Sequence, residues 1–297
     1  MMENETTNLN LPSSNANETT FANNNIDEEE FFNEPLQQYS FEEHSVLRRF
    51  QTYCGIFSHA LSLISIGTVL HWTRQLGGFA SLGSSGQTKL VFNWHPLLMT
   101  TAFFFMTVAS LSFRFSFCGY LWSDRSMIKL VHGSAWLVAA LCATVALIAV
   151  VRSHNDKASG YIANLYSLHS WIGVAVIFFY VVQFLVAFFS FGWTLHCVTP
   201  SIKATILRIH KFLGPALYLS TAATILLGIQ EKEGFVGCSY KVDEADLFPV
   251  RHFGHIPAPC RTSHALGLSV LMVAISTSFA LYDFSNPHPV SGIDRER

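Results

Sequence analysis

Hydrophobic residues fall in six long runs that follow residue 50, and short or polar stretches separate the runs. The runs cover residues 53–73, 91–113, 130–151, 163–191, 206–229 and 263–284. A helix needs about 20 apolar residues to cross the roughly 30 Å hydrocarbon layer of a bilayer, and every run reaches that length. Because a helix satisfies its backbone hydrogen bonds internally, the pattern predicts an all-α bundle of six transmembrane helices.

The two ends of the chain have a different character. Residues 1–45 are polar, include the acidic stretch 27–30, and show neither a helical nor a strand period. Such a segment cannot bury a core, so we predict a disordered tail. The expected organisation is this tail, a six-helix membrane domain over residues 46–285, and a second short tail over residues 286–297.

Composition agrees with a membrane protein. Half of the 297 residues are hydrophobic and 13% are charged, whereas about a quarter of the residues of a soluble domain are charged. The formal net charge is −2, so we expect no nucleic-acid partner. Membrane lipid is the expected surrounding of this integral multi-pass protein.

The distribution of basic residues predicts the orientation. Lysines and arginines near helix ends favour the cytoplasmic side. One side of the predicted bundle carries Arg48, Arg49, Arg114, Arg125, Lys129, Lys203, Arg208, Lys211, Arg295 and Arg297. The other side has fewer in its short segments, and those of its long fifth loop are accompanied by acidic residues. We therefore expect both termini in the cytoplasm.

Four histidines lie near the starts of the second to fifth runs. They are His95, His132, His169 and His210, and they are 37, 37 and 41 residues apart. Because successive helices alternate in direction, His95 and His169 are expected at one depth near the non-cytoplasmic face. His132 and His210 are expected at a second depth near the cytoplasmic face.

Polar side chains at such depth are costly and usually functional. Two imidazoles on different helices at one depth can bind a haem iron from both sides, an arrangement suited to electron transfer. Levels about 10–14 residues apart along a helix are separated by about 15–20 Å. The pattern thus favours two haems. Three other interpretations stay open: histidines bonded only within the bundle, a haem-free metal or proton transporter, and a haem-bearing anchor that takes electrons from a protein partner.

Several motifs surround these histidines. They occupy residues 93–99, 129–132, 166–173 and 228–232, together with His210 followed by Gly214. With them, the chain resembles the cytochrome b561 family over residues 50–285. It departs from the family pattern at Phe117, where the family has arginine, and at Trp136, where animal and plant members have histidine.

The resemblance implies six helices and two b haems, held by His95 with His169 and by His132 with His210. It implies a transmembrane ascorbate-dependent oxidoreductase, of the ferrireductase or monodehydroascorbate reductase type. Its donor is cytoplasmic ascorbate and its non-cytoplasmic acceptor is a ferric chelate or monodehydroascorbate. A homodimer is also implied, in an endomembrane (vacuole or endosome) or the plasma membrane.

Basic residues at the cytoplasmic helix ends are candidates for binding the ascorbate anion through charge-assisted hydrogen bonds. They are Arg114, Lys129, Arg208 and Lys211. Lys129 is the strongest single candidate, because it lies three residues before His132 and so on nearly the same helix face. On the opposite side, we expect electrons to leave near Asn93, Tyr166 and Ser167.

Two cysteines, Cys238 and Cys260, lie in the long fifth loop. The non-cytoplasmic side of most membranes is oxidising, so we expect these two residues to form a disulfide.

Overall fold

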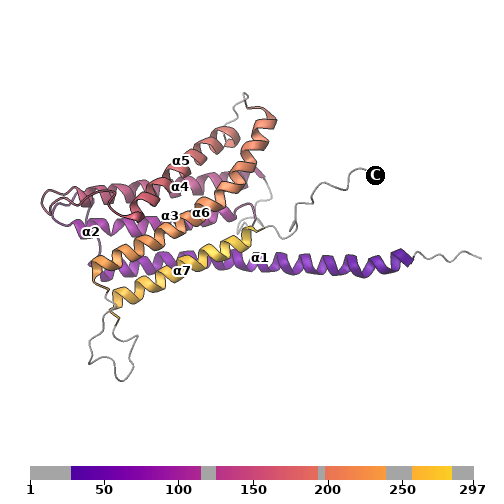
Figure 1. The fold of residues 1–297 in the computed structure, drawn as a ribbon, viewed down its shortest axis with the longest axis horizontal. Helices are drawn as coiled ribbons and strands as arrows, with labels where there is room; N and C mark the ends of the chain where they lie inside the picture. The colour runs from indigo at the N-terminus through magenta and orange to yellow at the C-terminus, as the bar shows by residue number, and fades with distance from the viewer. Residues whose placement is uncertain (1–27, 115–124, 193–197, 239–255, 283–297) are drawn as a thin grey trace, which may run out of the picture. The chain divides into compact units, whose positions relative to one another are not determined.

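A computed structural model of the chain describes residues 28–114, 125–192, 198–238 and 256–282, and every regular element in them is a helix. The chain divides into two units, residues 1–45 and 46–297, and the packing described below is that of the second unit. The elements are α1 (Glu28–Gln75), α2 (Thr88–Phe92), α3 (Trp94–Leu111), α4 (Arg125–His154), α5 (Leu168–Ala187), the π-helical turn η1 (Phe188–Gly192), α6 (Pro200–Val236) and α7 (Ala258–Leu281) (Figure 1).

The prediction of six membrane-spanning helices is confirmed. Six helical segments are long and apolar enough to cross a bilayer, and each overlaps one of the six hydrophobic runs. They are Ser45–Gln75, Thr88–Leu111, Ser126–His154, Leu168–Gly192, Pro200–Val236 and Ala258–Leu281. The protein is an all-α, multi-pass membrane protein.

The main difference from the sequence prediction lies at the start of α1. We expected residues 1–45 to lack regular structure, whereas α1 begins at Glu28. Three consecutive glutamates stand at the start of this helix in the sequence, and acidic residues are favourable in the first turn of a helix. Residues 1–27 and the whole of the second expected tail, 286–297, lie outside the described residues.

Local signals explain where α5 and α6 begin and end. Ser167 caps α5 by accepting from the backbone N–H of Ser170, so the helix begins five residues after the start of its hydrophobic run. Thr199 caps α6 in the same way and Pro200 occupies the first turn, where its missing N–H leaves no bond unmade. Gly237 ends α6 with a positive φ of 82°, which glycine adopts without strain.

The second span is interrupted just before its histidine. Pro96 has no N–H to donate to the carbonyl of Phe92, and the helix is broken at Asn93 between α2 and α3. The buried Asn93 side chain donates to the Gly78 carbonyl at 2.7 Å. The next residue, Trp94, donates through its indole to the Ala80 carbonyl at 2.8 Å. These bonds fix the backbone from which His95 projects.

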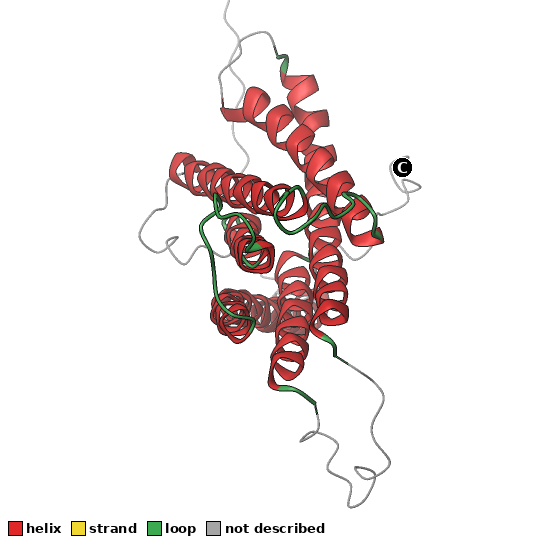
Figure 2. Ribbon diagram, turned by 90° about the vertical axis from the view of Figure 1, so that its left-hand side faces the viewer, coloured by secondary structure: helices red, strands yellow, loops and turns green. Residues whose placement is uncertain are grey.

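Helix packing is organised around α3 and α6. Helix α3 packs against α4 and α6, and α6 also packs against α5 and α7 (Figures 1 and 2). None of the residues of α5 is buried, so this helix presents most of its apolar surface outward. Helices α1 and α7 are joined by two buried hydroxyl pairs, Ser58 with Ser276 at 2.7 Å and Ser65 with Ser269 at 2.9 Å.

One carboxylate joins the loop after α1 to the loop after α4. Asp156 accepts from the hydroxyl of Ser85 at 2.9 Å and from the backbone N–H of Gly86 at 2.6 Å. Gly86 has a φ of +77°, so the turn that presents its N–H favours glycine. The bonds from Gly86 and then Ser85 lower the pKa of Asp156 below its ordinary value.

A lowered carboxyl pKa adds stability above the unfolded value of about 3.9, and that contribution disappears as the pH falls through the folded value. We expect wild-type protein to melt at a higher temperature than Asp156→Asn at neutral pH. Plotted against pH, the melting temperatures of the two proteins should converge at pH values below the folded pKa. A constant difference in melting temperature over the whole acidic range would mean that the carboxylate charge contributes nothing to stability.

Candidate functional site: two histidine pairs

The four predicted histidines form two pairs. His95 of α3 faces His169 of α5, with ring centroids 6.1 Å apart and an interplanar angle of 86°. His132 of α4 faces His210 of α6, with centroids 6.0 Å apart and an angle of 68°. We call these the 95/169 pair and the 132/210 pair. The two helices that each pair joins are not consecutive along the chain.

The spacing within each pair fits two axial ligands of one metal. A metal–nitrogen bond to histidine is about 2 Å long, and the ring centre lies about 1 Å beyond the nitrogen, so two opposed imidazoles on one metal have centroids about 6 Å apart. Both pairs have this spacing. The spacing of each pair therefore suits one metal held by both rings.

Backbone carbonyls hold three of the four imidazoles. The Nδ1 atom of His132 donates to the Ala109 carbonyl at 2.8 Å, and that of His169 donates to the Thr224 carbonyl at 2.9 Å. The Nδ1 atom of His95 donates over a longer 3.3 Å, to a carbonyl of α4. A carbonyl only accepts, so the proton is on Nδ1 and the Nε2 lone pair is free for a metal.

The partners of these bonds also place the pairs at two levels. Ala146, whose carbonyl accepts the hydrogen bond from His95, lies 14 residues after His132 on α4. On α6, His210 and Thr224 are 14 residues apart as well. This interval corresponds to about 21 Å along a helix axis. The predicted two-level arrangement thus has the same spacing on both helices.

A glycine makes room for one imidazole. A Cβ atom built on Gly228 of α6 lies 2.7 Å from Cε1 of His169 and 3.1 Å from its Nδ1. Real Cβ atoms essentially never approach another heavy atom to 2.7 Å, so the ring packs directly on the α6 backbone. Gly228 lies one turn after Thr224, the residue whose carbonyl holds the same ring.

Among the described residues, no three or more His, Cys, Asp or Glu side chains gather where they could hold a metal ion. The histidines occur only as pairs, and a pair leaves most coordination positions of a free ion to other ligands. A haem provides four nitrogens itself and needs two axial ligands. The residues present therefore fit a haem better than a free metal ion.

The four predicted substrate residues lie at the end of the bundle that carries the 132/210 pair, and their side chains are exposed. Arg114 lies three residues after the end of α3, next to Phe113, whose ring lies 5.2 Å from that of His132. Lys129 lies one turn before His132 on the same face of α4. The other two, Arg208 and Lys211, are two residues before and one residue after His210, so they lie on different faces of α6 from it.

Sequence reasoning missed a cluster beside the 95/169 pair. The ring of Phe92 lies 5.6 Å from His95 and stacks on His154, 6.4 Å away at 7°. The ammonium group of Lys232 lies 4.4 Å from the centre of the same ring. His154 is the last residue of α4. Three separate segments form this cluster, and no sequence spacing indicates it.

Next to this cluster, two expected exit residues bond to one carboxylate. Tyr166 donates to Glu231 at 2.5 Å, and Ser167 donates to the other oxygen of Glu231 at 2.9 Å. Partial burial and then the bond to Glu231 raise the pKa of Tyr166. The third expected residue, Asn93, is buried at the α2–α3 break. The ring of Tyr166 lies 6.4 Å from that of His154, so the carboxylate of Glu231 is linked through Tyr166 to the cluster beside the 95/169 pair.

The predicted disulfide is confirmed. Cys238, just after α6, is bonded to Cys260 in the first turn of α7. The bond joins the ends of these helices on either side of the long fifth loop. Cys238 follows Lys232 by less than two turns, so the bond lies at the end of the bundle that carries the 95/169 pair.

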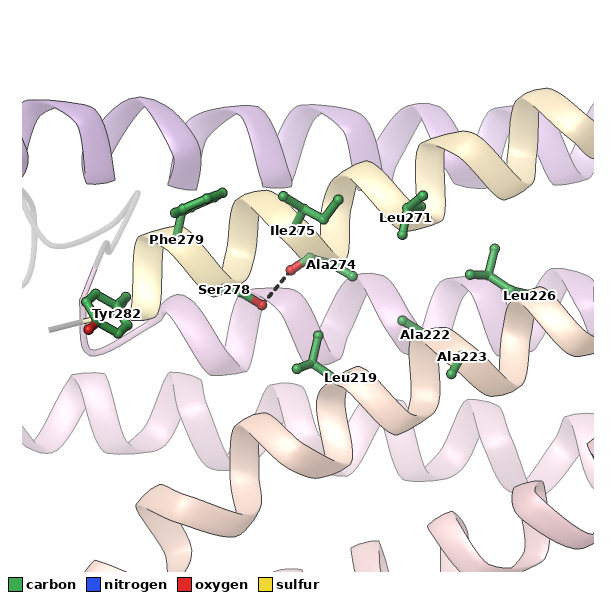
Figure 3. Close-up of a pocket in the computed structure, with 10 residues that line it drawn as sticks. All are labelled: Leu219, Ala222, Ala223, Leu226, Leu271, Ala274, Ile275, Ser278, Phe279 and Tyr282. Carbon is green, nitrogen blue, oxygen red and sulfur yellow. Dashed lines mark hydrogen bonds between the residues drawn. The ribbon is translucent and has the colours of Figure 1, made fainter.

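A hollow between α6 and α7 has a different character. Its volume is about 590 Å³, and its lining is almost wholly apolar (Figure 3). The one bond drawn there is internal to α7, from the Ser278 hydroxyl to the Ala274 carbonyl at 2.8 Å. None of the four histidines lines the hollow. We therefore assign it no part in the redox site.

Comparisons with known proteins agree with this geometry. The sequence profile of the eukaryotic cytochrome b561 family matches residues 94–236. The chain is 34% identical over 191 residues to the plasma membrane ascorbate-dependent reductase CYBRD1 of Rattus norvegicus, covering 63% of each protein. It is 31% identical over 183 residues to the ascorbate-specific transmembrane electron transporter 1 of Zea mays, covering 61% of this chain and 73% of the maize protein.

A further relative is matched over most of its length. The lysosomal membrane ascorbate-dependent ferrireductase CYB561A3 of Homo sapiens is 30% identical over 252 residues, which cover 84% of this chain and 95% of the human protein. The match to the rat reductase spans 63% of that protein's length. With the two histidine pairs, the six spans and these matches, the chain belongs to the cytochrome b561 family.

Proposed function

We propose that this protein transfers electrons across its membrane, from cytoplasmic ascorbate to a non-cytoplasmic acceptor, with two bis-histidine b haems as cofactors. The acceptor is a ferric chelate or monodehydroascorbate. The observation that supports this most strongly is the occurrence of two imidazole pairs, each about 6 Å between centroids. Relatives named as ascorbate-dependent reductases support the same reaction class.

Haem b supplies a one-electron couple when it is bound, and the chain supplies the ligands and their orientation. His95 and His169 would hold one haem, and His132 and His210 the other. The Nδ1 bonds to backbone carbonyls keep three of the imidazoles in the tautomer that leaves Nε2 free. All four imidazoles are half-buried between the helices.

The two ends of the bundle suit two different substrates. At the 132/210 end, Arg114 and Lys129 would hold the ascorbate anion, and Arg208 and Lys211 would add positive charge. At the 95/169 end, Lys232 and His154 beside Phe92 would attract an anionic acceptor. This assignment requires the 132/210 end and both termini to be cytoplasmic.

The membrane would be an endomembrane or the plasma membrane, and a homodimer is the expected assembly.

The direct test is an ascorbate-reduced minus oxidised difference spectrum of purified protein, with the haem-to-protein ratio from the same sample. We expect two b haems per chain, mostly reduced by ascorbate. Haem that dithionite reduces and ascorbate does not would instead indicate a protein donor. Absence of haem would overturn the proposal and favour a haem-free metal or proton transporter.

Lys129→Gln tests the donor site. We expect the KM for ascorbate to rise about fivefold to tenfold with little change in haem content, because an exposed charged hydrogen bond contributes at the low end of the usual range. Stopped-flow reduction by ascorbate measures the effect. Lys203→Gln on α6 makes the same change away from His132 and is the matched control. Equal effects of the two variants would mean that only net charge matters.

A further inference from the structure

Two buried polar atoms near the 132/210 pair lack hydrogen-bond partners, and they are complementary. Among the described residues, the Nδ1 atom of His210 and the Oε1 atom of Gln183 are both buried and unpaired. The Nδ1 atom of His210 is a donor whenever Nε2 of the same ring binds a metal, and the Oε1 atom of Gln183 is an acceptor. The other three paired histidines all place Nδ1 on a backbone carbonyl. His210 is the exception.

The position of Gln183 fits a bond to this histidine. Gln183 lies on α5, which packs against α6. Its amide nitrogen is 3.6 Å from where a Cβ atom on Gly214 would lie. Gly214 is four residues after His210, so it is one turn along the same face of α6, about 6 Å away. The amide group of Gln183 thus lies within one helical turn of the imidazole.

The side chain can make this approach without moving the backbone. A glutamine has three rotatable side-chain bonds, and a half-turn of its amide exchanges the oxygen and nitrogen positions. Glycine at 214 leaves the space beside the amide open. An unpaired donor and an unpaired acceptor are each unfavourable in a dry interior, so pairing them is favoured.

We infer that Gln183 is the positioning residue of His210: its carboxamide oxygen accepts the Nδ1 proton and holds the imidazole with Nε2 toward the haem. The inference rests on the proposed two-haem function. A bonded Nδ1 proton makes the imidazole a stronger electron donor to iron, which favours the ferric state. Three of the four ligands receive this support from the backbone, whereas His210 receives it from a side chain.

Redox titration and low-temperature EPR of the full-length protein in lipid nanodiscs test the inference. Gln183→Leu keeps the volume and removes the acceptor, so one of the two midpoint potentials should become more positive and the g values of one low-spin haem should shift. That haem should also dissociate about tenfold faster. Gln183→Glu replaces the amide by a stronger acceptor, so the same potential should move in the opposite direction.

Gln230→Leu is the matched control, because it makes the same chemical change at an exposed position of α6. It should leave both potentials and both EPR signals unchanged. Wild-type protein with fewer than two haems would contradict the proposed function itself. Two haems in the wild type, with unchanged potentials and g values in Gln183→Leu, would overturn only the role of Gln183.

Discussion

Gly228→Ala is expected to release the haem of the 95/169 pair, so that the haem-to-protein ratio falls by about half. The added methyl group would lie 2.7 Å from Cε1 of His169. The ring cannot retreat without losing its bond to the Thr224 carbonyl. Because Thr224 and Gly228, which both contact the ring, lie one turn apart on α6, a ring movement that relieves the contact at Gly228 breaks the bond at Thr224. A pyridine haemochrome assay on purified protein measures the ratio.

A second glycine of the same helix provides the control. No atom lies within 4 Å of a Cβ built on Gly234, so Gly234→Ala should keep the full haem content. It should also be as stable as the wild type or slightly more so, since alanine favours a helix by about 1 kcal/mol over glycine. Full haem content in Gly228→Ala as well would show that His169 does not need this close approach.

Replacing histidines in combination is expected to give haem losses that depend on the pairing. His95→Leu and His169→Leu should each remove one haem, and the double variant should remove no more than either alone, because both ligands serve the same iron. Combining His169→Leu with His210→Leu should remove both haems. Electron transfer from ascorbate across proteoliposomes should be lost in every case, since either level alone spans only part of the bilayer.

The haem-to-protein ratio and the rate of reduction of an enclosed ferric chelate provide the two measurements. Phe178→Leu, an exposed apolar position on α5, is a control for general damage to the bundle. Equal haem losses from the double variant of His95 and His169 and the double variant of His169 and His210 would contradict the assignment of histidine partners.

The sequence was sufficient to predict the spans and the partners of each histidine. Apolar length determined the six helices, and their alternating direction was enough to match His95 with His169. The helical start of the N-terminal region was missed, because residues 28–45 show no apolar period that would indicate a helix. The break at Asn93 follows from Pro96, but periodicity averaged over a whole span does not reveal it.

The surroundings of the histidines were much less predictable. The acceptors for three of the four rings are backbone carbonyls, and every residue has one, so no residue type indicates them. The cluster of Phe92, His154 and Lys232 forms only when the ends of three segments meet. Lys129 stays a prediction; it was chosen because a spacing of three residues on a helix gives a shared face, a relation that local sequence does contain.

The use of backbone carbonyls has a consequence for how this site can change over time. A carbonyl oxygen survives any side-chain replacement at its position, so substitutions at Ala109 or Thr224 that keep the helix also keep the imidazole bonds. The ligand geometry is thereby protected from most mutations in its immediate surroundings. Sensitivity is concentrated at the few positions where a side chain, or the lack of one, is required, such as Gly228. A bundle of this kind can exchange most of its apolar residues while the chemistry at its centre stays the same.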